Sequence, residues 1–416
     1  MNSMPLPHPG TTVLRPILAA ILLLTLAAGS LLAADIQLPA SPPTSRTVDL
    51  VEQWRVGGED DEDVLLGLVQ TAVMDADGNT YLLDRQLSQV LVISPEGEWI
   101  DTLGRQGEGP GELNRPHGLL LMDSGQIAVI QGFPGRVTLL NRDGTPGGEI
   151  TIGEASEGGF NFVRELALVD GKLVGTTGRG TFDMDSGKSR TVSTLSVMDL
   201  EGKELAEITR HEQENDFQRR VFDEAANFSE QDQWAVSPQG VVYTTPERDA
   251  YAVNARNLDG ALLHTLRREF SPRKRDEEDR QQLTDGMIVV INGRRQEIES
   301  KTLDHDPAIM GLDVADDGRL FVTNCFDRRS ELPEGCGARY DVISPEGSFI
   351  EELTLRVPDF DPDYDNLVFL DGTHFMHLKN VESARNAMMA GFQEAGEEED
   401  AEAEAEPLEV VMYALP

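Results

Sequence analysis

The feature that most constrains this chain is a unit of four short apolar runs separated by glycine-containing turns. Its clearest copy covers residues 71–103, with apolar runs at 71–74, 80–83, 89–93 and 99–103. The tetrapeptides Asp-Ala-Asp-Gly and Ser-Pro-Glu-Gly separate the first run from the second and the third from the fourth. Runs rich in Val, Ile, Tyr and Trp that are broken by such turns predict antiparallel strands joined by tight hairpins. One four-stranded sheet of this kind cannot bury both of its faces, so it needs neighbours.

The same unit returns five more times along the chain. The glycine of its first hairpin aligns at six positions, which are Gly78, Gly125, Gly171, Gly240, Gly318 and Gly372. A second turn glycine follows in five of the copies, and the two glycines are 19 residues apart in each of the first two copies. Such internal repetition is typical of folds in which one supersecondary unit packs on the next.

These repeats predict an all-β fold, a six-bladed β-propeller over residues 46–416. The blades are expected at about 70–103, 117–152, 164–209, 233–267, 309–355 and 365–416. The sixth unit takes its third strand from 408–414 and lacks a fourth, whereas 46–56 is a strand-like run without a unit of its own. We therefore expect 46–56 to complete the last sheet and close the ring, which removes exposed sheet edges.

The first 34 residues have the layout of a secretory signal peptide. The amino terminus and Arg15 precede an apolar run at 17–28, and small residues follow up to a cleavage position near Ala33 or Ala34. The alternative is an uncleaved membrane anchor, because 17–34 holds 18 residues without a charge. The segment predicts an exported protein, periplasmic or extracellular, which is attached to a membrane only if the segment is kept.

The long insertions fall on one predicted face of the propeller. If the strands of a blade are called A to D from the centre outward, the A–B and C–D turns share one face, and these turns are short. The other face receives the B–C loops 175–190, 324–339 and 379–407 and the D–A connections 211–231 and 268–308. We call it the long-loop face and expect the binding surface there, because loops on a rigid scaffold commonly carry function.

Three parts of these insertions have a local signature. Ser271 resembles a helix N-cap with Pro272 at the first helical position, and 381–394 also predicts a helix. The acidic run at 396–406 is typical of a solvated linker, with cation binding as the alternative.

The candidate ligand-binding residues lie at strand ends that converge on the channel mouth of the long-loop face. The A-strand starts are Gln70, His117, Arg164, Glu165, Trp234, Met310, Asp365 and Asn366, and the B-strand ends add Arg85, Thr177 and Asn324. Of these we select Arg85, His117, Arg164, Glu165, Trp234, Asn324 and Asp365 as the binding set.

Several of these residues have a second interpretation. His117 is either a ligand or a packed, hydrogen-bonded structural residue, and Trp234 either stacks on a sugar or peptide or wedges between blades. Arg105, Arg115 and Arg164 are placed to receive an anionic group, or equally to pair with carboxylates.

An alternative site would hold a metal at the channel mouth. Glu165, Asn324, Asp365 and Asn366 supply oxygen donors of the kind that Ca²⁺ prefers, but a calcium cage takes six or more oxygens. The sequence contains no GxSxG, HExxH, P-loop or CxxC motif, and no catalytic residue is identified.

The net charge limits the classes of binding partner, and the cysteine content predicts a disulfide. The chain holds 74 Asp and Glu against 35 Lys and Arg, a formal net charge of −39. This balance excludes nucleic acid, because phosphate binding needs clustered Lys and Arg. The only cysteines, Cys325 and Cys336, are eleven positions apart, and in an exported protein such a pair predicts a disulfide.

The stretch GRQGEGPGEL at 104–113, followed by RPHGLLLMDSGQIAVI, resembles exported six-bladed β-propeller proteins related to NHL-repeat domains. That family shows a Gly-x-x-Gly-x-Gly-Pro-Gly-Glu-Phe stretch before a Pro-x-Gly strand start, and Leu113 stands here in place of its Phe. The segment MGLDVADDGRLFVTN at 310–324 is also similar. The resemblance covers about 46–416 and implies the fold and export, not an activity.

Two function hypotheses follow. The first is a non-catalytic binding or scaffold propeller, without a cofactor, that recognises a peptide, glycan or protein on the long-loop face. The second is a lactonase- or lyase-like propeller enzyme that holds Ca²⁺ or Zn²⁺ at the channel mouth. The fold by itself does not decide between them.

Overall fold

The computed structural model describes residues 34–59, 61, 63–133, 135–153, 159–183, 186–216, 221–285, 289–291, 294–296, 299–327, 332–390 and 406–416. All of them belong to one compact unit, Ala33–Pro416. The predicted signal segment lies outside the described residues except for Ala34, and the acidic run 396–406 does so except for Glu406. Within the described ranges, no helix is long and apolar enough to cross a membrane.

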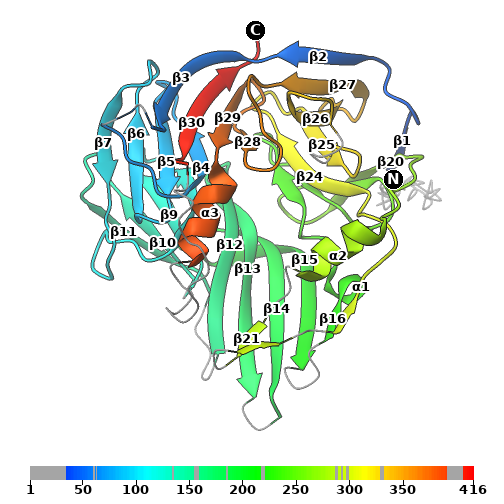
Figure 1. The fold of residues 1–416 in the computed structure, drawn as a ribbon. Coiled ribbons are helices and arrows are strands. Elements are labelled where there is room, and N and C mark those ends of the chain that lie inside the picture. The colour runs from blue at the N-terminus through cyan, green and yellow to red at the C-terminus, as the bar shows by residue number, and fades with distance from the viewer. Residues whose placement is uncertain are drawn as a thin grey trace, which may run out of the picture. The chain divides into compact units, whose positions relative to one another are not determined.

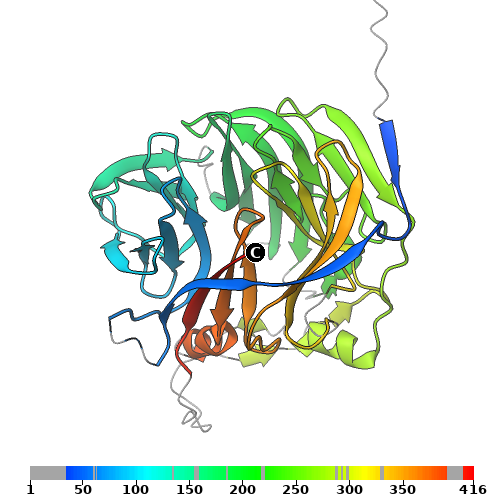
Figure 2. The same ribbon diagram turned by 90° about the horizontal axis from the view of Figure 1, so that it is seen from above.

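Six antiparallel sheets follow one another around a common axis, which confirms the predicted six-bladed β-propeller (Figures 1 and 2). Blade 1 consists of β4 (Val69–Met74), β5 (Thr80–Asp84), β6 (Gln89–Ile93) and β7 (Trp99–Leu103). Blade 2 consists of β8 (Pro116–Leu121), β9 (Ile127–Gln131), β10 (Arg136–Leu140) and β11 (Pro146–Thr151). Blade 3 has the longest strands, β12 (Gly159–Val169), β13 (Lys172–Asp183), β14 (Lys188–Met198) and β15 (Glu204–Asp216).

The second half of the ring is built in the same way. Blade 4 consists of β17 (Trp234–Val236), β18 (Val242–Thr244), β19 (Ala252–Arg256) and β20 (Leu262–Arg268). Blade 5 consists of β24 (Ile309–Val314), β25 (Leu320–Asn324), β26 (Cys336–Ile343) and β27 (Phe349–Arg356). Blade 6 consists of β28 (Asn366–Phe369), β29 (His374–Lys379) and β30 (Glu409–Ala414), completed by β3 (Val51–Gly57) from the N-terminal side.

The ring closes as predicted, but the predicted closing strand 46–56 is divided between two blades. Only β3 pairs antiparallel with β30, from Val51 opposite Ala414 to Gly57 opposite Glu409. Residues before Leu50 form β2 (Ser45–Asp49), which adds a parallel fifth strand to β27 of blade 5. Further upstream, β1 (Ala34–Leu38) adds a parallel fifth strand to β20 of blade 4. The N-terminal segment therefore covers the outer edges of two blades before it closes the third, as the blue strands of Figure 1 show.

The repeated turns explain why the blades recur at these positions. The five aligned glycines Gly78, Gly125, Gly240, Gly318 and Gly372 have φ between +76° and +86°, a region that side chains disfavour. Blade 3 instead makes a two-residue turn in which Asp170 and Gly171 both have positive φ. Apolar clusters fill the spaces between neighbouring blades, for example Trp234 and Val242 of blade 4 against Val169 and Val174 of blade 3.

The additional elements gather on the lower side of Figure 1, where the strands of blade 3 also project. The D–A connection after blade 3 holds β16 (Val221–Asp223) and α1 (Glu224–Asn227). The connection after blade 4 holds α2 (Glu277–Asp285), β21 (Val289–Ile291), β22 (Arg294–Gln296) and β23 (Glu299–Lys301), of which β23 pairs with β16. The B–C loop of blade 6 holds α3 (Val381–Ala390).

Two local predictions change in the structure. The helix expected from Ser271 begins instead at Glu277, where the carboxylate of Asp276 accepts a hydrogen bond from the backbone N–H of Asp279 at 2.8 Å, as a capping residue does. The predicted disulfide is absent, because Cys325 and Cys336 are both free and buried. The two thiols have different neighbours: Cys336 lies opposite Arg356 of β27, and the Sγ of Cys325 accepts a hydrogen bond from the backbone N–H of Arg273 at 3.2 Å.

Candidate functional site

Four of the predicted site positions are the extra residues of β-bulges. At the start of the innermost strand, the register skips one residue in blades 1, 2, 3 and 5. The skipped residues are Gln70, His117, Arg164 and Met310. A bulge turns its extra side chain away from the regular pleat. The same bulge therefore redirects one side chain in each of these four blades at the channel mouth.

His117 joins blade 2 to blade 3. Its Nε2 atom lies 2.8 Å from the carbonyl oxygen of Arg164. Gly132 makes room for the imidazole, because a Cβ at that position would lie 2.9 Å from His117 Cε1. Burial lowers the pKa of His117, and the positive charge of nearby Arg85 lowers it as well. His117 is therefore a neutral, hydrogen-bonded residue that also borders the surface.

A row of phenylalanines continues from Arg164 along β12 and onto the neighbouring blade. The Arg164 guanidinium carbon lies 5.6 Å from the centre of the Phe162 ring, within range of a cation–π interaction. Phe160 lies 6.4 Å from Phe162, and Phe133 of the β9–β10 turn meets Phe160 edge to face at 5.6 Å. Phe133 is 65% exposed and Phe160 39%, so these rings form a shelf that solvent reaches.

Two glycines of β13 make this shelf flat. Phe160 pairs in register with Gly180, and Phe162 pairs with Gly178. A Cβ on Gly180 or Gly178 would lie only 2.2 Å from the Cζ atom of the ring opposite. The rings therefore rest directly on the β13 backbone, in the space that side chains would otherwise fill.

Three of the described arginines carry no ion-pair partner. Among the arginines whose side chains the structure describes, three make no ion pair, and these are Arg85, Arg115 and Arg179. Arg115 directly precedes the Pro116–His117 strand start, and Arg85 is near enough to influence His117. Arg164 reaches a single carboxylate, Asp232, at 4.0 Å. Arg105, by contrast, is paired with Glu112 at 2.8 Å.

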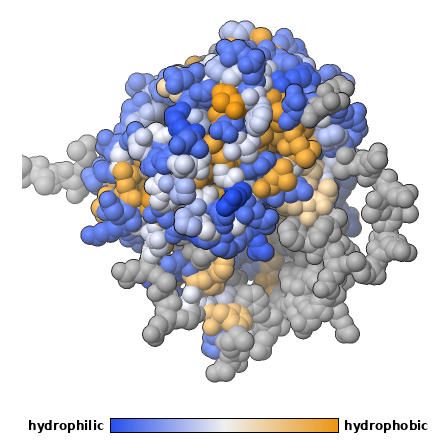
Figure 3. All heavy atoms as spheres, turned by 90° about the vertical axis from the view of Figure 1, so that its left-hand side faces the viewer, coloured by the Kyte–Doolittle hydropathy of each residue, from blue (hydrophilic) through white to orange (hydrophobic). Residues whose placement is uncertain are grey.

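These contacts define a continuous surface across blades 1 to 3, which we call the rim surface. It consists of Arg85, His117, Phe133, Phe160, Phe162 and Arg164. We add the exposed Arg115 because it lies two residues before His117 in the chain. By contrast, the side of the unit that carries β7 and β11 is largely hydrophilic with scattered apolar patches (Figure 3).

Trp234 and Glu165 lie on the innermost strands of blades 4 and 3. Trp234 is buried at the interface of blades 3 and 4, in agreement with its interpretation as a wedge. The Glu165 side chain keeps contact with solvent, yet the surrounding protein raises its pKa, an effect that a hydrogen bond from Trp234 opposes. Burial and the charge of Glu165 raise the pKa of Asp313, on the innermost strand of blade 5, to about 7.

Asn324 and Asp365 are buried in separate hydrogen-bond networks. The Nδ2 of Asn324 donates to Asp341 at 3.3 Å, and Arg268 contacts the same carboxylate at 2.6 Å. Asp365 accepts from the fully buried His377 at 2.8 Å, an arrangement that lowers its pKa although its burial opposes the shift.

The alternative metal donors are therefore not gathered into one site. Asn324 and Asp365 are engaged in these two networks, and Asn366 begins β28, where it pairs in register with Leu378. In the part of the chain that the structure describes, no three His, Cys, Asp or Glu side chains are arranged to hold a metal ion.

A buried ion network fixes the insertion after blade 4. Arg275 holds Glu224 of α1 with two hydrogen bonds of 2.8 and 2.9 Å, and it reaches Asp306 at 2.8 Å. Arg273 contacts the second oxygen of Asp306 at 2.7 Å, and Arg248 also pairs with Glu224. The network gives the long-loop face a rigid support between blades 3, 4 and 5.

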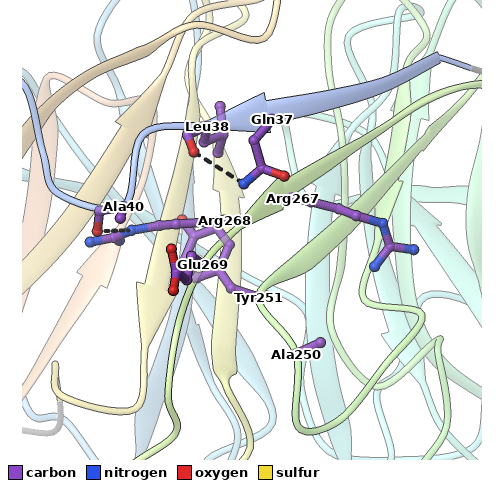
Figure 4. Close-up of a pocket in the computed structure, with 8 residues that line it drawn as sticks. All are labelled: Gln37, Leu38, Ala40, Ala250, Tyr251, Arg267, Arg268 and Glu269. Carbon is purple, nitrogen blue, oxygen red and sulfur yellow. Dashed lines mark hydrogen bonds between the residues drawn. The ribbon is translucent and has the colours of Figure 1, made fainter.

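A pocket of about 560 Å³ lies where the N-terminal strand β1 covers blade 4 (Figure 4). The Nε of Arg268 donates to the carbonyl of Ala40 at 3.1 Å, while its guanidinium lies over Tyr251 at 5.3 Å. These contacts hold the N-terminal segment against blades 4 and 5, so we assign the pocket a structural role.

Of the seven predicted binding residues, the structure brings Arg85, His117 and Arg164 together. The phenylalanines of the rim surface were not predicted. The sequence contains two pairs of residues that are each two positions apart, Phe160 with Phe162 and Gly178 with Gly180. The strand register places each phenylalanine opposite one of these glycines.

Comparison with protein-family models and with curated protein sequences found no match. Among solved structures, a candidate exported protein from Bacteroides fragilis is 11% identical with a TM-score of 0.47, over 92% of this chain and 100% of that one. A gluconolactonase from Xanthomonas campestris is 12% identical with a TM-score of 0.40, over 85% and 87%. The calcium-binding protein regucalcin from Agrobacterium tumefaciens is 12% identical with a TM-score of 0.40, over 89% and 97%. At these values the likeness does not extend to function.

Proposed function

We propose that this protein is an exported, non-catalytic binding propeller whose partner docks on the rim surface. The observation that supports it is the combination of solvent-accessible phenylalanines with unpaired arginines on one edge of the long-loop face. Aromatic residues, Phe among them, and arginines are enriched at protein interfaces relative to the rest of the surface. The protein has no need of a cofactor in this role.

The scaffold around the surface suits this function. Blades 1, 2 and 3 each contribute part of the rim surface, and the His117–Arg164 hydrogen bond fixes two of them relative to each other. A preformed surface loses little conformational entropy when a partner binds, which favours affinity. Export follows from the N-terminal 34 residues, which predict a periplasmic or extracellular protein.

Site-specific photocrosslinking tests the proposal. A photoreactive phenylalanine analogue is placed at Phe160, and a matched control carries it at Trp99, which is 52% exposed on β7. We expect a crosslinked partner from Phe160 in exporting cells, loss of that product in an R115Q/R164Q background, and none from Trp99. Equal products at both positions, or none at Phe160, would contradict the proposal. Fractionation and N-terminal sequencing of the mature chain test export and the cleavage near Ala33 or Ala34.

A further inference from the structure

The rim surface combines apolar rings with cationic side chains. Phe133 contacts Phe160, Phe160 lies 6.4 Å from Phe162, and the guanidinium carbon of Arg164 lies over the Phe162 ring at 5.6 Å from its centre. Arg85 is close enough to His117 to lower its pKa, and Arg115 precedes His117 by two residues. A ligand that contacts both the rings and the arginines must present an apolar group close to an anionic group, because the guanidinium carbon of Arg164 lies 5.6 Å from the centre of the Phe162 ring.

The phenylalanines favour an apolar side chain over a sugar. A phenyl ring has no hydrogen-bonding group, so sugar hydroxyls placed on the shelf would lose water without gaining a partner. An aliphatic or aromatic side chain loses no hydrogen bond there and buries apolar surface. The spacing also suits a peptide, since side chains two residues apart in an extended chain point the same way and lie about 6.6 Å apart.

The arginines favour a carboxylate. The chain has about two acidic residues for every basic one, and most of its described arginines are paired with carboxylates of the protein. Arg85 and Arg115 have no such partner although acidic residues are abundant. A guanidinium offers a planar fork of donors that matches a carboxylate in two parallel hydrogen bonds.

We propose that the rim surface binds an acidic peptide segment in which an apolar side chain and a carboxylate side chain lie two residues apart. The inference rests on the proposed function, because it names the ligand class of the same surface. A net charge of −39 repels a uniformly acidic partner at long range, but salt screens that field beyond about 8 Å at physiological ionic strength. The surface therefore suits a short motif in a partner of moderate charge.

Fluorescence anisotropy on the full chain tests the ligand class. The probe is a labelled peptide that repeats Phe-Ser-Glu-Ser, and its matched controls replace every Glu by Gln or every Phe by Ala. We expect the acidic probe to bind and both controls to bind at least tenfold more weakly. R115Q/R164Q and F160S each weaken the acidic probe at least tenfold, whereas R356Q and W99S, exposed sites outside the rim surface, change its affinity less than twofold.

Defined results overturn this proposal. If the Glu and Gln peptides bind equally, the surface does not recognise a carboxylate. If F160S and R115Q/R164Q leave the affinity for the acidic peptide unchanged, the rim surface is not the binding site. Binding of an oligogalacturonate without binding of the acidic peptide shows a glycan ligand instead. If the crosslink at Phe160 persists while the acidic peptide fails to bind, the ligand class is wrong and the binding surface stands. If both fail, the proposed function fails with it.

Discussion

The Nε2 atom of His117 lies 2.8 Å from the carbonyl oxygen of Arg164, and this contact joins the innermost strands of blades 2 and 3. A carbonyl oxygen only accepts hydrogen bonds, so the imidazole must carry a proton on Nε2. Both residues lie at β-bulges, which direct the His117 ring toward the neighbouring blade. The hydrogen bond therefore sets the relative position of two parts of the rim surface.

Removal of this bond is expected to cost about 1 kcal/mol of unfolding free energy, the usual size for one hydrogen bond. His117→Ala makes that change, and Gly132→Ala disturbs the same ring because its Cβ would lie 2.9 Å from His117 Cε1. We expect Gly132→Ala to be more destabilising in the natural chain than in a His117→Ala background. Urea unfolding of the four variants measures the coupling. Additive effects would show that Gly132 does not serve the imidazole.

Gly180 offers a way to disturb the shelf without changing a charge. A Cβ at Gly180 would lie 2.2 Å from Phe160 Cζ, and the three closest atoms all belong to that ring. Gly180→Ala must displace Phe160, so we expect it to weaken the acidic peptide about as much as F160S does. In an F160S background the same change has no ring to displace. A further loss of affinity there would place the effect of Gly180 elsewhere.

The fold was predictable because each blade carries its own local signal. Turn glycines with positive φ and short apolar runs mark every hairpin, as at Gly78 and Gly125. The parallel fifth strands β1 and β2 leave no such trace, because no turn joins either of them to the blade that it extends. The division of 46–56 between blades 5 and 6 was missed for this reason.

Candidate site residues could be predicted only where the place of a residue at a strand end is enough to locate its side chain. Arg85, His117 and Arg164 follow from the repeat, since equivalent positions of successive blades meet at one rim. Asn324 and Asp365 occupy such positions too, but they are buried with Asp341 and His377, partners that tertiary packing selects. The predicted disulfide was wrong, since closeness in sequence alone does not bring two thiols into contact.

The absence of the disulfide gives a direct chemical test. Cys325 and Cys336 are both free, and burial raises the pKa of the Cys325 thiol, which slows its reaction because the thiolate is the reactive form. We expect two reactive thiols per chain in denaturant without reductant, and slow labelling of the folded protein. Thiol titration and intact-mass measurement read this out. If denatured protein reacts as a thiol only after reduction, Cys325 and Cys336 form a disulfide after all.

The ion network around Arg275 is expected to contribute strongly to stability. Arg275 is 5% exposed and holds both Glu224 and Asp306, so its removal leaves the buried Asp306 with Arg273 as its one described ion-pair partner and the partly buried Glu224 with Arg248. We expect Arg275→Met to cost about 3 kcal/mol. The matched control is Arg356→Met, which breaks the exposed pair with Asp49 and should cost less than about 1 kcal/mol. Denaturant unfolding distinguishes the two, and equal costs would contradict the structural role of the network.

Asp313 predicts a pH dependence of stability that a single substitution removes. Burial and the charge of Glu165 raise its pKa to about 7, compared with an ordinary aspartate near 3.9 in the unfolded chain. Below about pH 4 both states are protonated, and between pH 4 and 7 the folded state holds the proton more tightly. The stability from this protonation is lost as the pH rises through 7, because a charged Asp313 then remains beside Glu165 without compensation.

Asp313→Asn should therefore raise the unfolding free energy at pH 8 by about 1–3 kcal/mol and change it little at pH 4. Glu165→Gln removes the neighbouring charge, so it should lower the pKa of Asp313 and move the loss of stability to lower pH. Urea unfolding at intervals from pH 4 to 8 measures both effects. If natural protein and Asp313→Asn variant show parallel curves over that range, Asp313 does not titrate with a raised pKa. If Asp313→Asn changes the dependence of unfolding free energy on pH but Glu165→Gln does not, burial alone sets the pKa of Asp313.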